Sequence, residues 1–245
     1  MTKRWFGLSL CALIALLSYL VLTIPASQLI RACAASNIVC SFTRSDGTVW
    51  DGRWSGVTIA RNNQGVRLSS VGWHVSLLSL ISLKPELRLE VESDQGKISA
   101  LIVQQGEQFI VTDVLADLTV VQPMFSAQVV VNAPYVLADL SGVQQVDDAR
   151  VGVFDLRVNT GNSVLEAGAF SAVANGTNEA IEVQVRDGGG PIGASGDCRL
   201  FVPNYECSLL IDISRLSDDN IRRGLESVAS PLGNGQYQFD VAGRF

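Results

Sequence analysis

The stretch Leu87-Arg-Leu-Glu-Val-Glu-Ser93 carries the clearest pattern in the chain, a strict alternation of apolar and charged side chains. Its two leucines and its valine stand at every second position, with an arginine and two glutamates in the remaining places. Successive side chains of a β-strand point to opposite faces of a sheet. The pattern therefore predicts a strand with one face buried and the other in water.

The same period of two recurs on both sides of this stretch, separated by short turns. Gln105-Gly106-Glu107 is expected to close a hairpin, and Asn175-Gly176 is a strong turn dipeptide. About a dozen short strands at regular spacing predict an antiparallel sheet, arranged as a groove, a sandwich or a rolled sheet. The expected strands cover residues 48–60, 66–73, 87–93, 97–104, 108–112, 115–121, 128–132, 149–159, 163–174, 181–185, 193–200, 205–213 and 235–242.

One late helix is expected among these strands. Ser217 has the position of an N-cap, and the two aspartates after it suit the positive end of a helix dipole. Leu216 and Ile221 are placed for a hydrophobic staple. The helix should end near Ala229, before Pro231.

The N-terminal stretch from Trp5 to Ile24 has no charge and no proline. A helix of about 20 such residues spans the roughly 30 Å of a bilayer core. Lys3 and Arg4 precede it, which predicts a cytoplasmic N-terminus at residues 1–4 and a periplasmic location for the rest. A cleaved signal peptide, with Ala32-Cys33-Ala34 as its processing site, is the alternative.

These patterns divide the chain into four parts. A cytoplasmic N-terminus at 1–4 and a transmembrane helix at 5–24 are followed by a membrane-proximal connector at 25–41 and a periplasmic β-rich domain at 42–245. Asn132-Ala-Pro134 and Ser141-Gly142 interrupt the strand pattern. A boundary between two β lobes is therefore expected near 132–142.

Four of the five cysteines form two close pairs, Cys33 with Cys40 and Cys198 with Cys207. An oxidising periplasm permits both pairs to be disulfides. A turn near Val202-Pro203 would place Cys198 directly opposite Cys207 on two antiparallel strands. Zinc binding is the alternative, but the spacing is not that of a zinc site and no histidine lies nearby.

The sequence gives no sign of catalytic chemistry. The only histidine, His74, has no nucleophile or orienting acid nearby in the sequence, and nucleotide-binding and metalloprotease motifs are absent. The net charge is −6, and no basic patch is present to bind nucleic acid. We therefore expect no catalytic residue, metal or cofactor, and a protein that is not an enzyme.

Two motifs carry a resemblance to a known family. The first is Gly47-Thr-Val-Trp-Asp-Gly-Arg-Trp-Ser-Gly56, and the second is the ending Gly235-Gln-Tyr-Gln-Phe-Asp-Val-Ala-Gly243 after the late helix. With the N-terminal apolar stretch, this layout resembles protein N of the type II secretion system, the GspN family. The residues that carry the motifs are Gly47, Trp50, Gly52, Gly56, Gly235, Tyr237, Phe239 and Gly243.

A structural role is favoured for these motif residues over direct contact with a partner. Glycines permit turns and close approach of strands, and tryptophans fill cores. The resemblance implies an accessory component of type II secretion that is anchored in the bacterial inner membrane and contacts other secretion components in the periplasm. The alternative is a lipid-binding or lipid-transfer protein of the lipopolysaccharide-transport or AsmA-like kind, because an apolar β groove on a membrane anchor also suits lipid.

Overall fold

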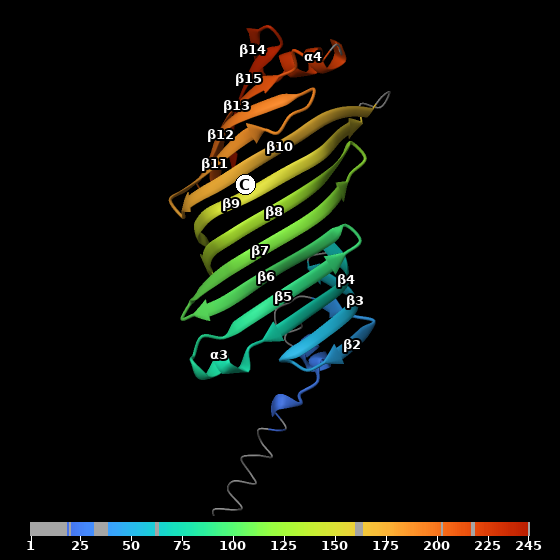
Figure 1. Ribbon diagram of the computed structural model, residues 1–245, viewed down its shortest axis with the longest axis vertical. Helices are drawn as coiled ribbons and strands as arrows, with labels where there is room; N and C mark the ends of the chain where they lie inside the picture. Colours follow the sequence, from blue (N-terminus) through green and yellow to red (C-terminus); the bar gives the residue numbers. More distant parts are fainter. Residues whose placement is uncertain are drawn as a thin grey trace, which may run out of the picture. The chain divides into compact units, whose positions relative to one another are not determined.

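The computed structural model describes residues 19, 21–31, 39–61, 64–159, 164–201, 203–216 and 219–244. Strands make up most of this part of the chain, and all strand pairs within each of its two compact units are antiparallel (Figure 1). The units divide between Asp94 and Gln95, and are called unit 1 and unit 2. Residues 132–142 lie in unit 2 and cover the end of β8, the turn at 140–141 and the first residue of β9.

Unit 1 contains a five-stranded sheet. Its main order is β1-β3-β4-β5, and β2 pairs with β3 beside β1. A 3-10 helix, η1, lies against β2 and β3. The elements are η1 (Ala26–Leu29), β1 (Val39–Ser41), β2 (Arg44–Gly47), β3 (Asp51–Arg61), β4 (Gln64–Val75), α3 (Leu77–Ile81) and β5 (Glu86–Ser93).

Unit 2 contains a ten-stranded sheet in which sequence order and spatial order agree from β6 to β13, followed by β15 and β14. Consecutive strands joined by short turns explain this meander. Its elements are β6 (Gly96–Gln105), β7 (Gln108–Val121), β8 (Phe125–Asp139), β9 (Gly142–Asn159), β10 (Val164–Thr177), β11 (Ala180–Asp187), β12 (Gly193–Phe201), β13 (Asn204–Asp212), α4 (Asp219–Glu226), β14 (Ser230–Gly233) and β15 (Gln236–Arg244).

The mostly β, antiparallel character of the fold is confirmed, and the sheet in each unit is open. The sandwich that the sequence left open does not form among the described residues. Their helices include α4, where a late helix was predicted, and the short α3 directly after β4. Ser217, the predicted N-cap, lies outside the described residues.

Several strands are longer than the sequence predicts, because bulges carry them through apparent breaks. Residues 108–112 and 115–121 form one strand, β7, with Asp113 at a φ of +52° between them. The predicted turn at Asn175-Gly176 is wrong: β10 continues through it, with a register shift there, and turns at Asn178-Glu179. A bulge absorbs an extra residue without ending the ladder.

Candidate functional site

The turn between β2 and β3 carries the first motif, and its backbone requires glycine at two positions. Gly47 has a φ of +82°, and a Cβ there would collide with the carbonyl oxygen of Asp51. Gly52 is its partner across the hairpin. A Cβ on Gly52 would lie 2.6 Å from the carbonyl oxygen of Thr48 and 2.6 Å from Cζ2 of Trp73. At this turn the backbones of β2 and β3 and the indole ring of Trp73 are in close contact.

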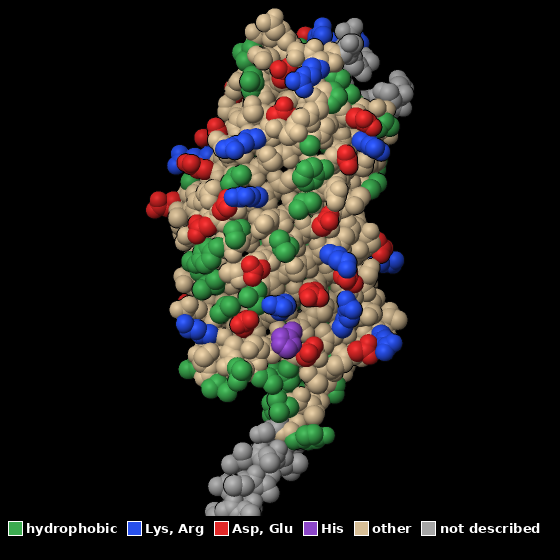
Figure 2. Space-filling model, viewed as in Figure 1, with side chains coloured by type: hydrophobic (Ala, Val, Ile, Leu, Met, Phe, Trp, Pro, Cys, Tyr) green, Lys and Arg blue, Asp and Glu red, His purple; other side chains and the backbone are tan. Residues whose placement is uncertain are grey.

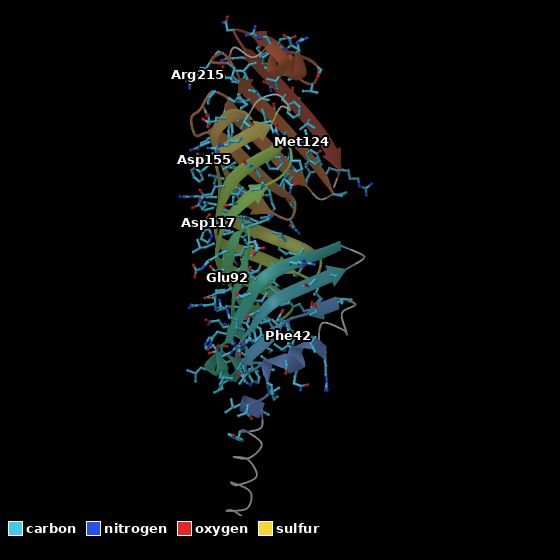
Figure 3. All side chains as sticks on the ribbon, turned by 90° about the vertical axis from the view of Figure 1, so that its right-hand side faces the viewer. Phe42, Glu92, Asp117, Met124, Asp155 and Arg215 are labelled. Atoms are coloured by element: carbon cyan, nitrogen blue, oxygen red, sulfur yellow. A yellow bond between two sulfur atoms is a disulfide. The ribbon has the colours of Figure 1, made fainter. Side chains whose placement is uncertain are left out.

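Aromatic side chains form the core of unit 1 on the face behind this turn. The Trp54 side chain is only 7% exposed and stacks on Phe42, with ring centroids 5.0 Å apart. The ring of Trp73 packs edge-on against the ring of Trp54, with the centroids 5.2 Å apart. Figure 3 labels Phe42 on this face and Glu92 on the opposite face of the sheet. Such pairs add to the stability gained from burying aromatic area.

The same turn binds the segment that precedes the sheet. The Nε1–H of Trp50 donates a hydrogen bond to the carbonyl oxygen of Val21 at 2.9 Å. The backbone N–H of Val49 donates to the carbonyl of Ile24 at 2.9 Å. Ala26 at the start of η1 is 1% exposed and packs in the Trp54 core. The first motif therefore fastens residues 21–26 to the sheet, and we call this set of contacts the clasp.

The polar side of unit 1 has an open hollow of about 400 Å³ beside the clasp. Nδ1 of His74, the purple side chain in Figure 2, lies 3.4 Å from Oδ2 of Asp51. Both side chains are mostly exposed, and such surface pairs contribute little to stability. The hollow is also lined by Asp46, Arg53, Arg88 and Glu90. Its mixed, solvated charges do not single out one ligand.

Unit 2 has one continuous apolar face. Paired positions on neighbouring strands share a face, so the register defines it. One row crosses β7 to β10 and a second crosses β10 to β15, and we call the two rows together the apolar lane. The first row is Leu118, Val129, Val153 and Phe170, and the second is Ala174, Val183, Cys198, Cys207 and Val241.

No second layer covers the apolar lane within the described part of unit 2. Every extensive contact between its elements joins neighbouring strands. The buried side chains along its central strands are small, chiefly Ala116, Ala127, Ala133 and Ala167, while the larger lane residues stay partly exposed. The opposite face carries residues such as Asp117, labelled in Figure 3, and Gln128, whose amide donates to it at 3.0 Å. The sheet is amphipathic, and the described residues do not form the second layer that usually buries an apolar face.

The cysteines of unit 2 lie on the apolar lane. Cys198 and Cys207 face each other across β12 and β13, and the structure has a disulfide between them with the Cα atoms 4.0 Å apart. This is the register expected from the sequence. The other predicted pair is not described, because Cys33 lies outside the described residues.

The second motif forms β15 and holds α4. Tyr237 is 4% exposed, and its hydroxyl donates to Oε1 of Glu226 in α4 at 3.4 Å. Burial raises the pKa of Tyr237, and the Glu226 carboxylate raises it further. Phe239 pairs with Leu209, and a Cβ on Gly243 would lie 2.6 Å from the hydroxyl oxygen of Tyr205. The second motif thus forms a strand that is paired on both sides, with β13 and β14, and that packs against α4.

The contacts of the clasp could not be deduced from the sequence. The first motif and the N-terminal stretch are separately visible, but nothing in the pattern joins Trp50 to Val21.

Most of the predicted transmembrane helix at 5–24 lies outside the described residues. No helix in the described part of the chain is long and apolar enough to span a bilayer. The described residues likewise include no group of three or more His, Cys, Asp or Glu side chains arranged to hold a metal ion.

Fold and site together define a class: an antiparallel β protein whose first motif binds residues 21–26 and whose apolar lane is not covered by any other described residues. The chain belongs to the family of type II secretion system protein N, whose model matches residues 41–240. The matched region includes the whole first motif and the first six of the nine residues of the second. Comparison with curated proteins and with solved structures gives no match. The resemblance inferred from the two motifs is confirmed, and membership supports an accessory role in type II secretion.

Proposed function

We propose that this protein is an inner-membrane-anchored accessory component of the type II secretion system. In this proposal residues 5–24 span the membrane, and the two β units lie in the periplasm, where they contact other secretion components. The single observation that carries the proposal is the family match over residues 41–240. The clasp supports it, because a sheet bonded to residues 21–26 would be held close to the bilayer.

The test is recovery of partners from native membranes. Photo-crosslinking from exposed positions of unit 2, followed by mass spectrometry, should recover secretion components. Deletion of the gene should reduce export of secreted proteins, and a plasmid copy should restore it. The proposal loses its support when crosslinking recovers none of these components and export is unchanged by the deletion.

The apolar lane favours a second function, periplasmic lipid carriage. A face of this kind suits acyl chains, because burying apolar area is favourable and needs no specific hydrogen bonds. Val129 and Val130 provide a matched pair, since neighbouring residues of β8 face opposite sides of the sheet. A photo-crosslinker at Val129 should capture lipid, and one at Val130 should not. Equal lipid capture at both positions, or none at Val129, contradicts this function.

A further inference from the structure

A short apolar projection follows β4 in unit 1. It comprises Ser76-Leu-Leu-Ser-Leu-Ile-Ser-Leu-Lys84, including α3, and is called the apolar tip. Leu78, Ile81 and Leu83 are 79%, 81% and 86% exposed. The tip contains no acid, and its single charge is Lys84 at its end. Three large aliphatic side chains held in water on so short a segment indicate an interaction surface.

The apolar tip is held in place by hydrogen bonds at its base. The Ser79 hydroxyl donates to the carbonyl of Ser76 and accepts from the backbone N–H of Glu86 at 2.9 Å. The N–H of Ser76 donates to the carbonyl of Glu86 at 3.0 Å. Leu83 has a φ of +56°, an unfavourable conformation for a leucine. The apolar tip therefore keeps its large side chains exposed, although this requires an unfavourable backbone conformation at Leu83.

The apolar tip lies beside the C-terminal end of the N-terminal apolar stretch. Leu22, Leu77 and Leu78 line one hollow of about 540 Å³, together with Trp50 of the clasp. Val21 and Leu22 are themselves about half exposed. Figure 1 places α3 at the end of unit 1 where residues 21–31 lie, and Figure 2 shows hydrophobic side chains gathered there.

We propose that the apolar tip inserts into the outer boundary of the same bilayer that residues 5–24 span. The inference rests on the anchored topology proposed above. The neighbouring chain supplies the argument for lipid: the uncharged stretch ends at Ile24, which the clasp holds against the turn before β3. Leu78, Ile81 and Leu83 would enter the acyl boundary, while Lys84 would reach the phosphate layer.

Insertion would give unit 1 two attachments to the membrane. A single transmembrane helix leaves the domain free to rotate about the helix axis. A second contact through the apolar tip fixes which side of the β3–β4–β5 sheet faces the bilayer. The charged hollow lined by Asp51, His74 and Arg88 would then have a constant orientation toward the periplasm.

Depth-dependent fluorescence quenching tests the insertion with the full chain. The fluorescent residue dansylalanine replaces Ile81, and the protein is reconstituted in vesicles of phosphatidylethanolamine and phosphatidylglycerol. The control carries it at Val66, which is 59% exposed at the opposite end of β4. We expect blue-shifted emission at position 81, with loss of intensity when the lipid acyl chains are brominated. Position 66 should show neither change.

The two proposals fail in different ways. When sodium carbonate washes the full chain off the vesicles, anchoring is wrong, and insertion of the tip is overturned with it. When the chain stays in the vesicles and position 81 is no more quenched than position 66, insertion alone is overturned. A signal at position 81 that depends on protein concentration, not on brominated lipid, shows that a second copy covers the tip and also overturns insertion.

Discussion

Unit 1 and unit 2 are built from the same kind of antiparallel strand, but they bury different side chains. Unit 1 packs Phe42, Trp54 and Trp73 together and covers them with η1. Unit 2 buries mainly alanines along its central strands and leaves its apolar lane uncovered by any second layer of described residues. Unit 1 therefore completes a core of its own, whereas the described part of unit 2 leaves an apolar face available for contact.

The largest expected effect comes from removing the centre of the unit 1 core. Trp54→Ala should lower the free energy of unfolding by about 3–5 kcal/mol, because a buried indole is replaced by a cavity. Denaturant unfolding followed by tryptophan fluorescence measures it. All four tryptophans of the sequence lie before residue 74, so this signal reports on unit 1.

Val66→Ala is the control for this loss, since Val66 is exposed on β4. It should change the free energy of unfolding by no more than about 0.5 kcal/mol. Equal effects of the two substitutions would show that unit 1 has no specific aromatic core, and the contrast with unit 2 would disappear.

The next effect belongs to unit 2. Replacing both Cys198 and Cys207 with serine should cost about 2.5–3 kcal/mol, because the disulfide closes a loop of about ten residues in the unfolded chain. Circular dichroism in the far ultraviolet, where strands of both units contribute, should show the lower stability. The tryptophan transition should keep its midpoint. A matching shift of that midpoint would show that the two units unfold together.

A smaller effect is expected where the backbone is crowded. Gly52→Ala should lower the stability of unit 1 by about 1–3 kcal/mol, because the added methyl overpacks the turn against Thr48 and Trp73. Gly65→Ala is its control: a Cβ there would lie 3.8 Å from the Cβ of Ala60, at ordinary contact distance. Denaturant unfolding followed by tryptophan fluorescence measures both variants. Equal unfolding midpoints for the two would show that the turn at Gly52 is not crowded.

The sequence predicts the strands far better than it predicts what covers them. Alternation in stretches such as Ile181–Val185 identifies a strand and its apolar face, and the spacing of Cys198 and Cys207 identifies their register. The alternation is the same, however, whether that face meets a second layer, a ligand or water. Strand ends are also hidden, because an Asp at positive φ or an Asn-Gly pair can be a bulge as readily as a turn.

The clasp shows a second limit of sequence reasoning. The Trp50 side chain bonds to the carbonyl of Val21, and the backbone N–H of Val49 bonds to the carbonyl of Ile24. Three of these four groups belong to the backbone, which leaves no trace in the composition or periodicity of the sequence. The apolar tip did leave a signal, the run Leu77-Leu-Ser-Leu-Ile81. Such a run is typical of a buried strand or helix, and only the structure places it in water.

The smallest expected effect is electrostatic and lies in unit 2. Asp212 accepts hydrogen bonds from the backbone N–H of Ser214 at 2.8 Å and from the amide of Gln236 at 3.3 Å. Hydrogen bonds from Ser214 and then Gln236 lower the pKa of Asp212 below its ordinary value of 3.8. A carboxylate with a lowered pKa stabilises the fold above the unfolded pKa, and this contribution is lost as the pH falls through the folded value.

Asp212→Asn should therefore destabilise unit 2 slightly at pH 7, and its difference from the unsubstituted protein should shrink as the pH falls below about 4. The Asp212 side chain is only partly buried, so solvent keeps the effect small. Urea unfolding followed by circular dichroism between pH 3 and 7 measures the difference. Asp113→Asn is the control, because no described residue donates a hydrogen bond to the Asp113 side chain. A difference in stability that stays constant with pH would mean that the Asp212 side chain stabilises the fold through packing and not through its charge. In that case, the turn before α4 would depend on packing around Ile213, as the core of unit 1 depends on packing around Trp54.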